Sequence, residues 1–442
     1  MLYYSTNKKT SPVSLHDAVV RGLAADKGLF MPEVIRRFPP AFYQNMKEMT
    51  LREISFVVAE AFFGEDVEAD KLQEIVFDAL NFDIPLVRVA DNRYSLELFH
   101  GPTLAFKDVG ARFMARLLGY FNRQEKRQVN VLVATSGDTG SAVANGFLDV
   151  PGVKVFVLYP QGKVSEIQEK QFTTLGHNIT ALEVSGTFDD CQALVKSAFM
   201  DPELNEKLYL TSANSINVAR FLPQAFYYFY AYAQLCGMVE HPEQVVFSVP
   251  SGNFGNLTAG LIAKRMGLPV KRFIAANNRN DVFLQYLRTG SYDPRPSIAT
   301  IANAMDVGDP SNFARILDLY GHSHEAICAD ISGVSYTDDE IRRTMHDTFH
   351  REQYLLDPHG ACGYQALVDG LQPGEIGICL ETASPAKFLD TVSDAVGETI
   401  SMPEKLRKFM QGEKQSILMP VGFNAFKHFL LNQQEGGWSF WA

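Results

Sequence analysis

The sequence predicts an α/β protein that contains parallel β-sheet. Short apolar runs rich in β-branched residues recur along the chain, and segments of helical length separate them. Strands that are apolar on both faces and alternate with helices are typical of parallel sheets. Glycine-rich turns follow two of these runs and open helices, as in open α/β sheets. We expect strands over residues 129–134, 153–158, 179–184, 244–249 and 376–380.

The first part of the chain has a different pattern. Residues 1 to about 95 read as mostly helical, with charged stretches and no alternation of strand and helix. Pro39 and Pro40 mark a loop there, because proline lacks the backbone donor that helices and strands use. We therefore expect a helical N-terminal region over residues 1–95 and a second region over 96–442. Within the second region, the aromatic segment Phe226–Tyr232 predicts a buried helix.

Composition and charge exclude several classes of protein. The 442 residues are 46% hydrophobic and 21% charged, with a formal net charge of −11. A negative protein does not favour nucleic acid or an anionic membrane as its main partner. The most apolar stretch, Phe221–Leu235, is interrupted by Pro223 and is short for a membrane span. We expect a globular protein of two or three domains that acts on small molecules.

The cysteines indicate a reducing compartment. There are five, and none forms a C-x-x-C pair, so neither a disulfide framework nor a structural zinc site is expected. His322-Ser323-His324 lacks familiar ligand spacing and predicts a loop, not a metal site. The first residues show no basic segment followed by an apolar one, so no secretory signal is expected. These observations predict a cytoplasmic protein without a metal.

Lys107 is the most informative residue. It ends a short apolar run behind a Gly-Pro turn, in Gly101-Pro102-Thr103-Leu104-Ala105-Phe106-Lys107-Asp108. Apolar surroundings lower the pKa of a lysine and make its amine a nucleophile. Such an amine can form a Schiff base with an aldehyde cofactor. For a lysine taken alone, a surface position at the start of a helix is the commoner explanation.

Two glycine-rich loops support a functional role for Lys107. Thr135–Ala142 follows the first expected strand, and Pro250–Asn256 follows the fourth. Free amides at a helix N-terminus favour bound anions. Neither loop fits the common nucleotide-binding patterns, and either one alone is equally explained as a helix N-cap. Two anion-binding loops and one amine together suit pyridoxal phosphate with an anionic substrate.

These residues resemble a known family. The octapeptide 101–108 is similar to the cofactor-lysine motif of the threonine synthases, which are fold-type II (tryptophan synthase β-like) pyridoxal-phosphate enzymes. Both glycine-rich loops also resemble that family. So do the segments 14–19, 26–32, 212–220 and 381–388. The N-terminal segments resemble the longer bacterial and fungal type. The resemblance implies a two-lobed fold with a small lobe of roughly 129–210, which would move if the enzyme closes on its substrate.

The resemblance also implies a reaction and its residues. O-phospho-L-homoserine and water would give L-threonine and phosphate, the last step of threonine biosynthesis, with no nucleic acid, membrane or obligate protein partner. Lys107 would hold the cofactor and move protons, and Thr382 would bond the pyridine nitrogen. The cofactor phosphate would be bound by Gly252, Asn253, Phe254, Gly255 and Asn256. The substrate would be bound by Ser136, Asp138, Thr139, Ser141, Ser215, Asn217 and Arg220.

Some points stay open at this stage. Several relatives carry Asn where this chain has Asp138, and a carboxylate beside the ring oxygen of the cofactor would repel it unless one group is protonated. Asp138 is therefore expected either at the cofactor or facing the loop backbone. Lys163 is expected either at the substrate phosphate or in solvent. His16, His100 and His359 have no motif partner and are expected to be structural. The acidic run 338–340 predicts the first turn of a helix.

Two alternative functions differ from the main one. A related phospholyase or threonine dehydratase-like enzyme would use the same lysine and loops but release a keto acid. A catalytically silent relative that senses a ligand would keep the anion loops and bind without turnover. The intact lysine, both loops and Arg220 favour an enzyme.

Overall fold

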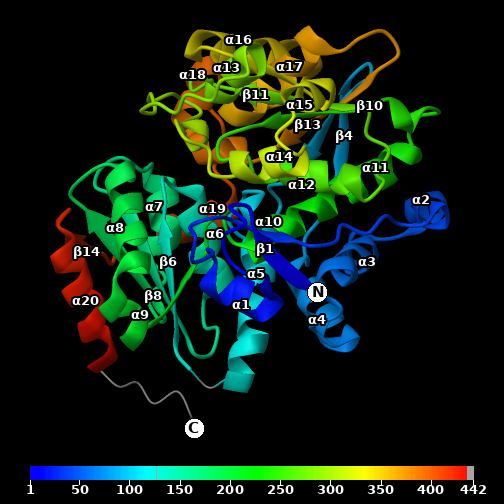
Figure 1. Ribbon diagram of the computed structural model, residues 1–442. Coiled ribbons are helices and arrows are strands. Elements are labelled where there is room, and N and C mark those ends of the chain that lie inside the picture. Colours follow the sequence, from blue (N-terminus) through cyan, green and yellow to red (C-terminus); the bar gives the residue numbers. More distant parts are fainter. Residues whose placement is uncertain (126, 436–442) are drawn as a thin grey trace.

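The computed structural model describes residues 1–125 and 127–435, and it confirms the predicted α/β class with parallel sheets. Two lobes each contain one such sheet, and an N-terminal region packs beside them (Figure 1). The large lobe lies at the top of Figure 1, the small lobe at the lower left and the N-terminal region at the lower right.

The large lobe is built on a six-stranded sheet of order β12-β11-β10-β13-β5-β4. The strands are parallel except for β4, which runs antiparallel to β5. Their bounds are β4 (Leu86–Ala90), β5 (Arg93–Glu97), β10 (Val245–Pro250), β11 (Arg272–Asn277), β12 (Ile331–Ser335) and β13 (Ile376–Glu381). The helices that follow these strands are α12 (Gly255–Arg265), α13 (Val282–Thr289), α14 (Phe313–Leu319), α15 (His324–Asp330), α16 (Asp338–Glu352), α17 (Pro358–Gly370) and α18 (Leu389–Val396).

The small lobe is built on a five-stranded parallel sheet of order β14-β8-β7-β6-β9. Its strands are β6 (Val129–Ala134), β7 (Val153–Pro160), β8 (Ile179–Val184), β9 (Tyr209–Ser212) and β14 (Ile417–Met419). Its helices are α6 (Asp138–Phe147), α7 (Glu166–Thr173), α8 (Phe188–Met200), α9 (Pro202–Lys207), α19 (Glu404–Met410) and α20 (Phe423–Glu435). The small lobe therefore includes α19, β14 and α20 from the C-terminal segment, which lie outside the range 129–210.

The N-terminal region is not helical throughout. A three-stranded antiparallel sheet is formed by β1 (Leu2–Ser5), β2 (Val13–Ser14) and β3 (Phe30–Pro32). Its helices are α1 (Leu15–Arg21), α2 (Pro40–Asn45), α3 (Leu51–Phe63) and α4 (Ala69–Ala79). They pack against α5 (Lys107–Glu125), α10 (Val218–Phe221) and α11 (Ala225–Cys236). The boundary expected near residue 95 falls within β5, and the division of the chain into domains stays a prediction.

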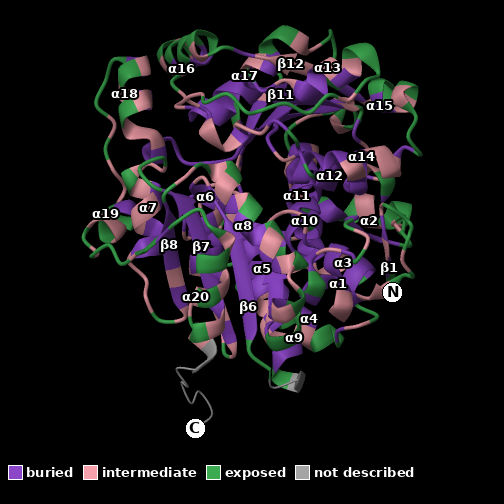
Figure 2. Cartoon of the chain, turned by 60° about the vertical axis from the view of Figure 1, so that its left-hand side comes forward, coloured by how far each residue is buried: buried purple, intermediate pink, exposed green. Residues whose placement is uncertain are grey.

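The predicted strands correspond to β6, β7, β8, β10 and β13, each within two residues at either end. Every residue of β6, β10 and β13 is buried, which explains their uninterrupted apolar runs. Figure 2 shows this burial for β6. The predicted aromatic helix is the buried helix α11, and the acidic run 338–340 opens α16. Short 3-10 turns occupy 46–48, 222–224, 242–244, 303–305 and 385–388.

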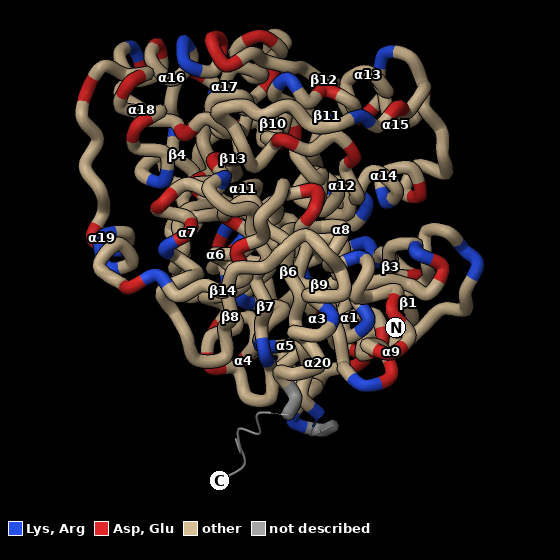
Figure 3. The backbone as a smooth tube through the Cα atoms, turned by 90° about the vertical axis from the view of Figure 1, so that its left-hand side faces the viewer, with Lys and Arg blue, Asp and Glu red and all other residues tan. Residues whose placement is uncertain are grey.

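The surface and the cysteines agree with the composition. Lysines, arginines and acidic residues are interspersed over the face seen in Figure 3. All five cysteines are free. Among the helices of residues 1–125 and 127–435, none is long and apolar enough to cross a bilayer.

Candidate active site

Lys107 is the first residue of α5, and the loop before it is held in place on both sides. The Asp108 carboxylate accepts hydrogen bonds from the Thr103 amide (2.9 Å) and the Thr103 hydroxyl (2.7 Å). The Phe106 amide donates to the Thr382 carbonyl at 2.8 Å. The last of these bonds joins the octapeptide to the residue that follows β13. Lys107 and Thr382 consequently line one cavity of about 120 Å³.

The environment of Lys107 activates its amine. Burial lowers the pKa of Lys107 from 10.5 to about 8, while Asp138 raises it and Arg220 and Lys387 lower it further. At a pKa near 8, roughly a tenth of the amine is unprotonated at neutral pH. Such a lysine serves both as a nucleophile toward an aldehyde and as a base.

The second glycine-rich loop lines the cavity between β10 and α12. Gly252, Asn253, Phe254, Gly255 and Asn256 all contribute to its wall. A Cβ on Gly252 would lie 2.7 Å from the Ala304 carbonyl oxygen, so only glycine fits this approach. The first two amides of α12, those of Gly255 and Asn256, have no acceptor within the helix and are available to an anion. This geometry suits a cofactor phosphate.

The side chains of Asn256 and Asn253 form hydrogen bonds with nearby protein groups. The side-chain amide of Asn256 donates to the Pro250 carbonyl (2.9 Å), and its carbonyl oxygen accepts from the Leu257 amide (2.9 Å). Asn253 donates to the Ser215 hydroxyl at 2.8 Å, and its carbonyl oxygen accepts from Ser311. The two asparagines therefore shape the loop with their side chains.

Three hydroxyl-bearing residues of the first glycine-rich loop, Thr135, Ser136 and Thr139, line the cavity. Asp138 and Ser141 do not line it. The Ser141 hydroxyl donates within the small lobe, to the carbonyls of Gly137 (3.1 Å) and Gln168 (3.2 Å). Gly137 has a φ of 144°, which only glycine adopts without strain.

Arg220 is the most unusual polar group of the site. It is 3% exposed and lines the same cavity as Lys107. Within the part of the chain that the structure describes, its Nε and Nη1 atoms have no hydrogen-bond partner. Burial lowers its pKa to about 10, although Asp108 raises it. A buried cation without partners is costly, so Arg220 is prepared to bind an anion.

Asn217 precedes α10, the short helix that carries Arg220. Its side-chain oxygen caps α10 by accepting from the Ala219 amide (3.0 Å), and its amide donates to the Val19 carbonyl (2.7 Å). Asn217 does not line the cavity, whereas Ser215 does. Asn217 therefore anchors Arg220's helix to the N-terminal region.

Asp138 has a partner that sequence reasoning missed. Its Oδ1 atom lies 2.5 Å from the Lys387 amine, and both side chains are buried. Burial alone would raise the pKa of Asp138, but Lys387 and Lys107 lower it well below its usual range. Asp138 is thus a carboxylate next to a cation, and it faces Lys387 and Gln168, not the loop backbone.

His359 also lines the cavity, as do residues 303–307 from the segment between α13 and α14. Its Nδ1 atom bonds the Asp357 carboxylate, and its Nε2 atom accepts from the Ala304 amide at 3.1 Å. His359 therefore holds this loop over the cavity. No local signal separates it from other histidines. Among the described residues, no group of three His, Cys, Asp or Glu side chains is placed to hold a metal.

His16, His100 and Lys163 do not line this cavity. His100 bonds Glu97 at 2.7 Å, and Lys163 is exposed in the turn after β7.

Comparison with known proteins agrees with this geometry. Residues 93–378 match the family described as pyridoxal-phosphate dependent enzyme, residues 2–80 match threonine synthase N terminus, and residues 360–430 match threonine synthase, C-terminal. Threonine synthase of Escherichia coli is 43% identical over 98% of this chain and 100% of its own length. The chain belongs to the threonine synthase family. Threonine synthase of Haemophilus influenzae is 44% identical over 98% of this chain and 100% of its own length.

Solved structures of the family have the same fold. The Escherichia coli threonine synthase structure superimposes with a TM-score of 0.92 over 98% of this chain and 100% of its own, at 43% identity. The threonine synthase of Brucella melitensis, solved with pyridoxal phosphate bound, has a TM-score of 0.91 at 34% identity and covers 98% of this chain and 99% of its own.

Pyridoxal phosphate is the cofactor of this family, and the residues of this chain fit it. A desolvated lysine amine, a glycine loop at a helix N-terminus and a threonine hydroxyl meet in one cavity.

Proposed function

We propose that the enzyme converts O-phospho-L-homoserine and water to L-threonine and phosphate. Arg220 carries this proposal, because its buried guanidinium lies in the Lys107 cavity without a partner for Nε or Nη1. A substrate phosphate would supply the missing acceptors, and charge-assisted bonds of this kind are strong. The family's relatives bear the name of this activity.

The assigned residues divide into two groups. We place the cofactor phosphate on the amides of the loop 252–256 and the pyridine nitrogen on the Thr382 hydroxyl. We place the substrate on Ser136, Thr139, Ser215 and Arg220. We assign the side chains of Asn256, Ser141 and Asn217 a supporting role, because their bonds are made within the loops and helices that carry the site.

Pyridoxal phosphate, when bound, withdraws electrons from the carbon that carries the substrate amine. Lys107 would hold the cofactor, and its amine would be free to act on the substrate once the substrate amine is bound there. The free Lys107 amine would take the proton from the α carbon and give it back within the site. The amine, neutral again, would then take a proton from the β carbon. Arg220 stabilises the phosphate that leaves the γ carbon. His359 and residues 303–307 form part of the cavity wall.

Product analysis tests the proposed function. With O-phospho-L-homoserine, we expect threonine and phosphate in equal amounts. Phosphate with 2-oxobutyrate in place of threonine would show a phospholyase or dehydratase-like reaction instead. Binding without either product would show a ligand-sensing protein.

The rate should depend on pH through Lys107. Only the unprotonated amine acts as a base, and the pKa of this amine is lowered to about 8. Activity should therefore rise about tenfold between pH 7 and pH 9 and then level off, whereas an ordinary lysine would still be gaining above pH 10. Steady-state rates under saturating substrate measure this profile. A profile that is flat from pH 6 to 9 would contradict the assignment of Lys107 as the base.

We further propose that the enzyme works in the cytoplasm and needs no protein partner for turnover. Its five free cysteines support a reducing compartment. Turnover by the purified chain alone, together with cell fractionation, tests both points.

A further inference from the structure

Lys387 is a buried lysine that the reaction described above does not use. It lies in the 3-10 turn Pro385–Phe388, shortly after Thr382, and its side chain is 0% exposed. Its amine donates to the Thr103 carbonyl at 2.9 Å and lies 2.5 Å from Asp138 Oδ1. Lysine is seldom fully buried unless it is paired, so the position calls for an explanation.

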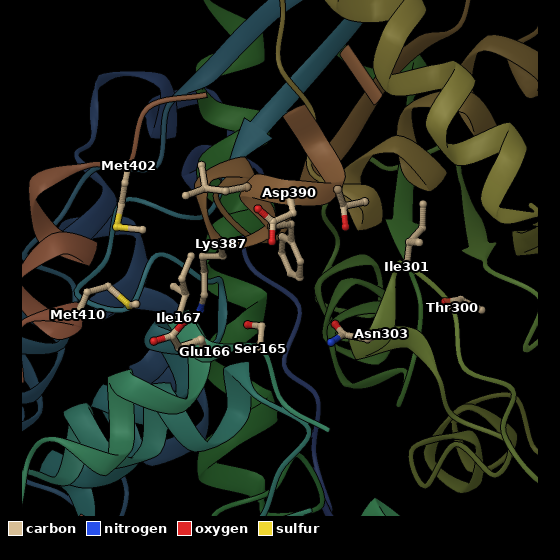
Figure 4. Close-up of a pocket in the computed structure, with 13 residues that line it drawn as sticks. Ser165, Glu166, Ile167, Thr300, Ile301, Asn303, Lys387, Asp390, Met402 and Met410 are labelled. Atoms are coloured by element: carbon tan, nitrogen blue, oxygen red, sulfur yellow. The ribbon is translucent and has the colours of Figure 1, made fainter. Parts of the chain in front are cut away.

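The bonds of Lys387 connect three separate parts of the site. Asp138 is the first residue of α6 in the small lobe, and Thr103 belongs to the loop that precedes Lys107. Lys387 also lines a second cavity of about 430 Å³ with Ser165 of the small lobe and Asn303 of the large lobe. Figure 4 shows its side chain pointing from its own segment toward the helices of the small lobe. Lys387 therefore bridges the lobes.

Two glutamines of α7 also donate hydrogen bonds to the groups that Lys387 contacts. Gln168 donates to Asp138 Oδ1 at 2.9 Å, and Gln171 donates to the Thr103 carbonyl at 3.1 Å. A side chain at position 137 would collide with Gln168, since a Cβ there would lie 2.5 Å from its Cδ atom. The carboxylate of Asp138 is consequently held in one orientation.

The charges of Asp138 and Lys387 both act on the pKa of the Lys107 amine. Asp138 favours its protonated form, whereas Lys387 and Arg220 oppose it, and these are the charged groups that act on it from α6, from the turn 385–388 and from α10. Asp108 is a further buried carboxyl that Lys387 influences. Without Lys387, the Asp138 charge would act on Lys107 uncompensated.

We propose that Lys387 is a positioning residue of the active site, which binds Asp138 to the loop before Lys107 and cancels its charge there. This inference rests on the proposed function only for the role of Lys107. It explains how this chain can carry a carboxylate at position 138: the carboxylate and the ammonium form a neutral unit that links the two lobes.

The pH dependence of Lys107 acylation tests the inference without substrate. Full-length protein freed of cofactor is treated with acetic anhydride from pH 6 to pH 11, and the Lys107 peptide is quantified by mass spectrometry against exposed lysines of the same chain. For Lys387→Met we expect the midpoint to rise by about one pH unit, which lowers labelling at pH 7 about tenfold. Asp138→Asn should move the midpoint down. The double variant should return close to wild type.

Lys405→Met is the matched control. Lys405 is exposed and donates to the His100 carbonyl at 3.1 Å, so it contacts the same segment without reaching Asp138. In this variant, the midpoint of Lys107 labelling should equal that of the wild-type protein. A purely structural Lys387 would lower the thermal unfolding temperature of Lys387→Met but leave the midpoint in place, and that result would overturn the inference. Opposite shifts in the two single variants support it, whether or not the enzyme makes threonine.

Discussion

Replacing Lys107 with alanine is expected to lower kcat by about 1,000-fold or more and to abolish the violet absorption of the bound cofactor. Lys107 lines the cavity with a pKa lowered to about 8, so it is the amine able both to attach an aldehyde and to move protons at neutral pH. Alanine removes both abilities at once. Absorption spectra and phosphate release measure the two losses separately.

Lys154→Ala provides the matched control for this variant. Lys154 is also partly buried, with a pKa lowered by desolvation, but it lies on β7 and donates to the Gln433 carbonyl at 2.8 Å. This variant should keep both the absorption band and the turnover. A Lys107→Ala protein that kept the violet band would show that another lysine holds the cofactor. Partial rescue of its turnover by an added primary amine would support the role of Lys107 as a base.

Replacing Arg220 with methionine is expected to lower kcat/KM for O-phospho-L-homoserine by about 100- to 1,000-fold. The guanidinium contributes charge-assisted bonds to the phosphate as it leaves, and methionine offers none. Inhibition by inorganic phosphate should weaken in parallel. Stability should not fall, because removing a buried cation with two unpartnered nitrogens removes a desolvation cost. Kinetics and thermal unfolding of the same samples measure both effects.

Arg112→Met should show the opposite combination. Arg112 is also buried, but its guanidinium donates to the carbonyls of Ala79 (2.9 Å) and Asp78 (2.7 Å). Its loss should lower the unfolding temperature and leave phosphate inhibition intact. Arg220→Lys keeps the charge and should retain part of the activity, since lysine lacks the bidentate geometry. An Arg220→Met enzyme with unchanged phosphate inhibition would exclude Arg220 from the phosphate site.

The sequence by itself determined the features that depend on local pattern. Strands β6, β10 and β13 are buried on both faces, so each appears as a continuous apolar run bounded by turn residues. Lys107 and the two glycine-rich loops were found in the same way, because a tight turn after a strand restricts which residues can occupy it. β9 and β14 gave no comparable signal, since they are short and pair with strands from distant parts of the chain.

The tertiary structure alone decided which charges face one another. Lys387 meets the Thr103 carbonyl across 284 residues of chain, and no spacing in the sequence predicts this contact. The same holds for Asp138, whose carboxylate lies beside the Lys387 ammonium and outside the wall of the cavity. Likewise, Asn217 and Arg220 lie in one short segment, yet only Arg220 lines the cavity. Local pattern specifies which chemical groups are present, whereas burial and partners across the fold set their charge and direction.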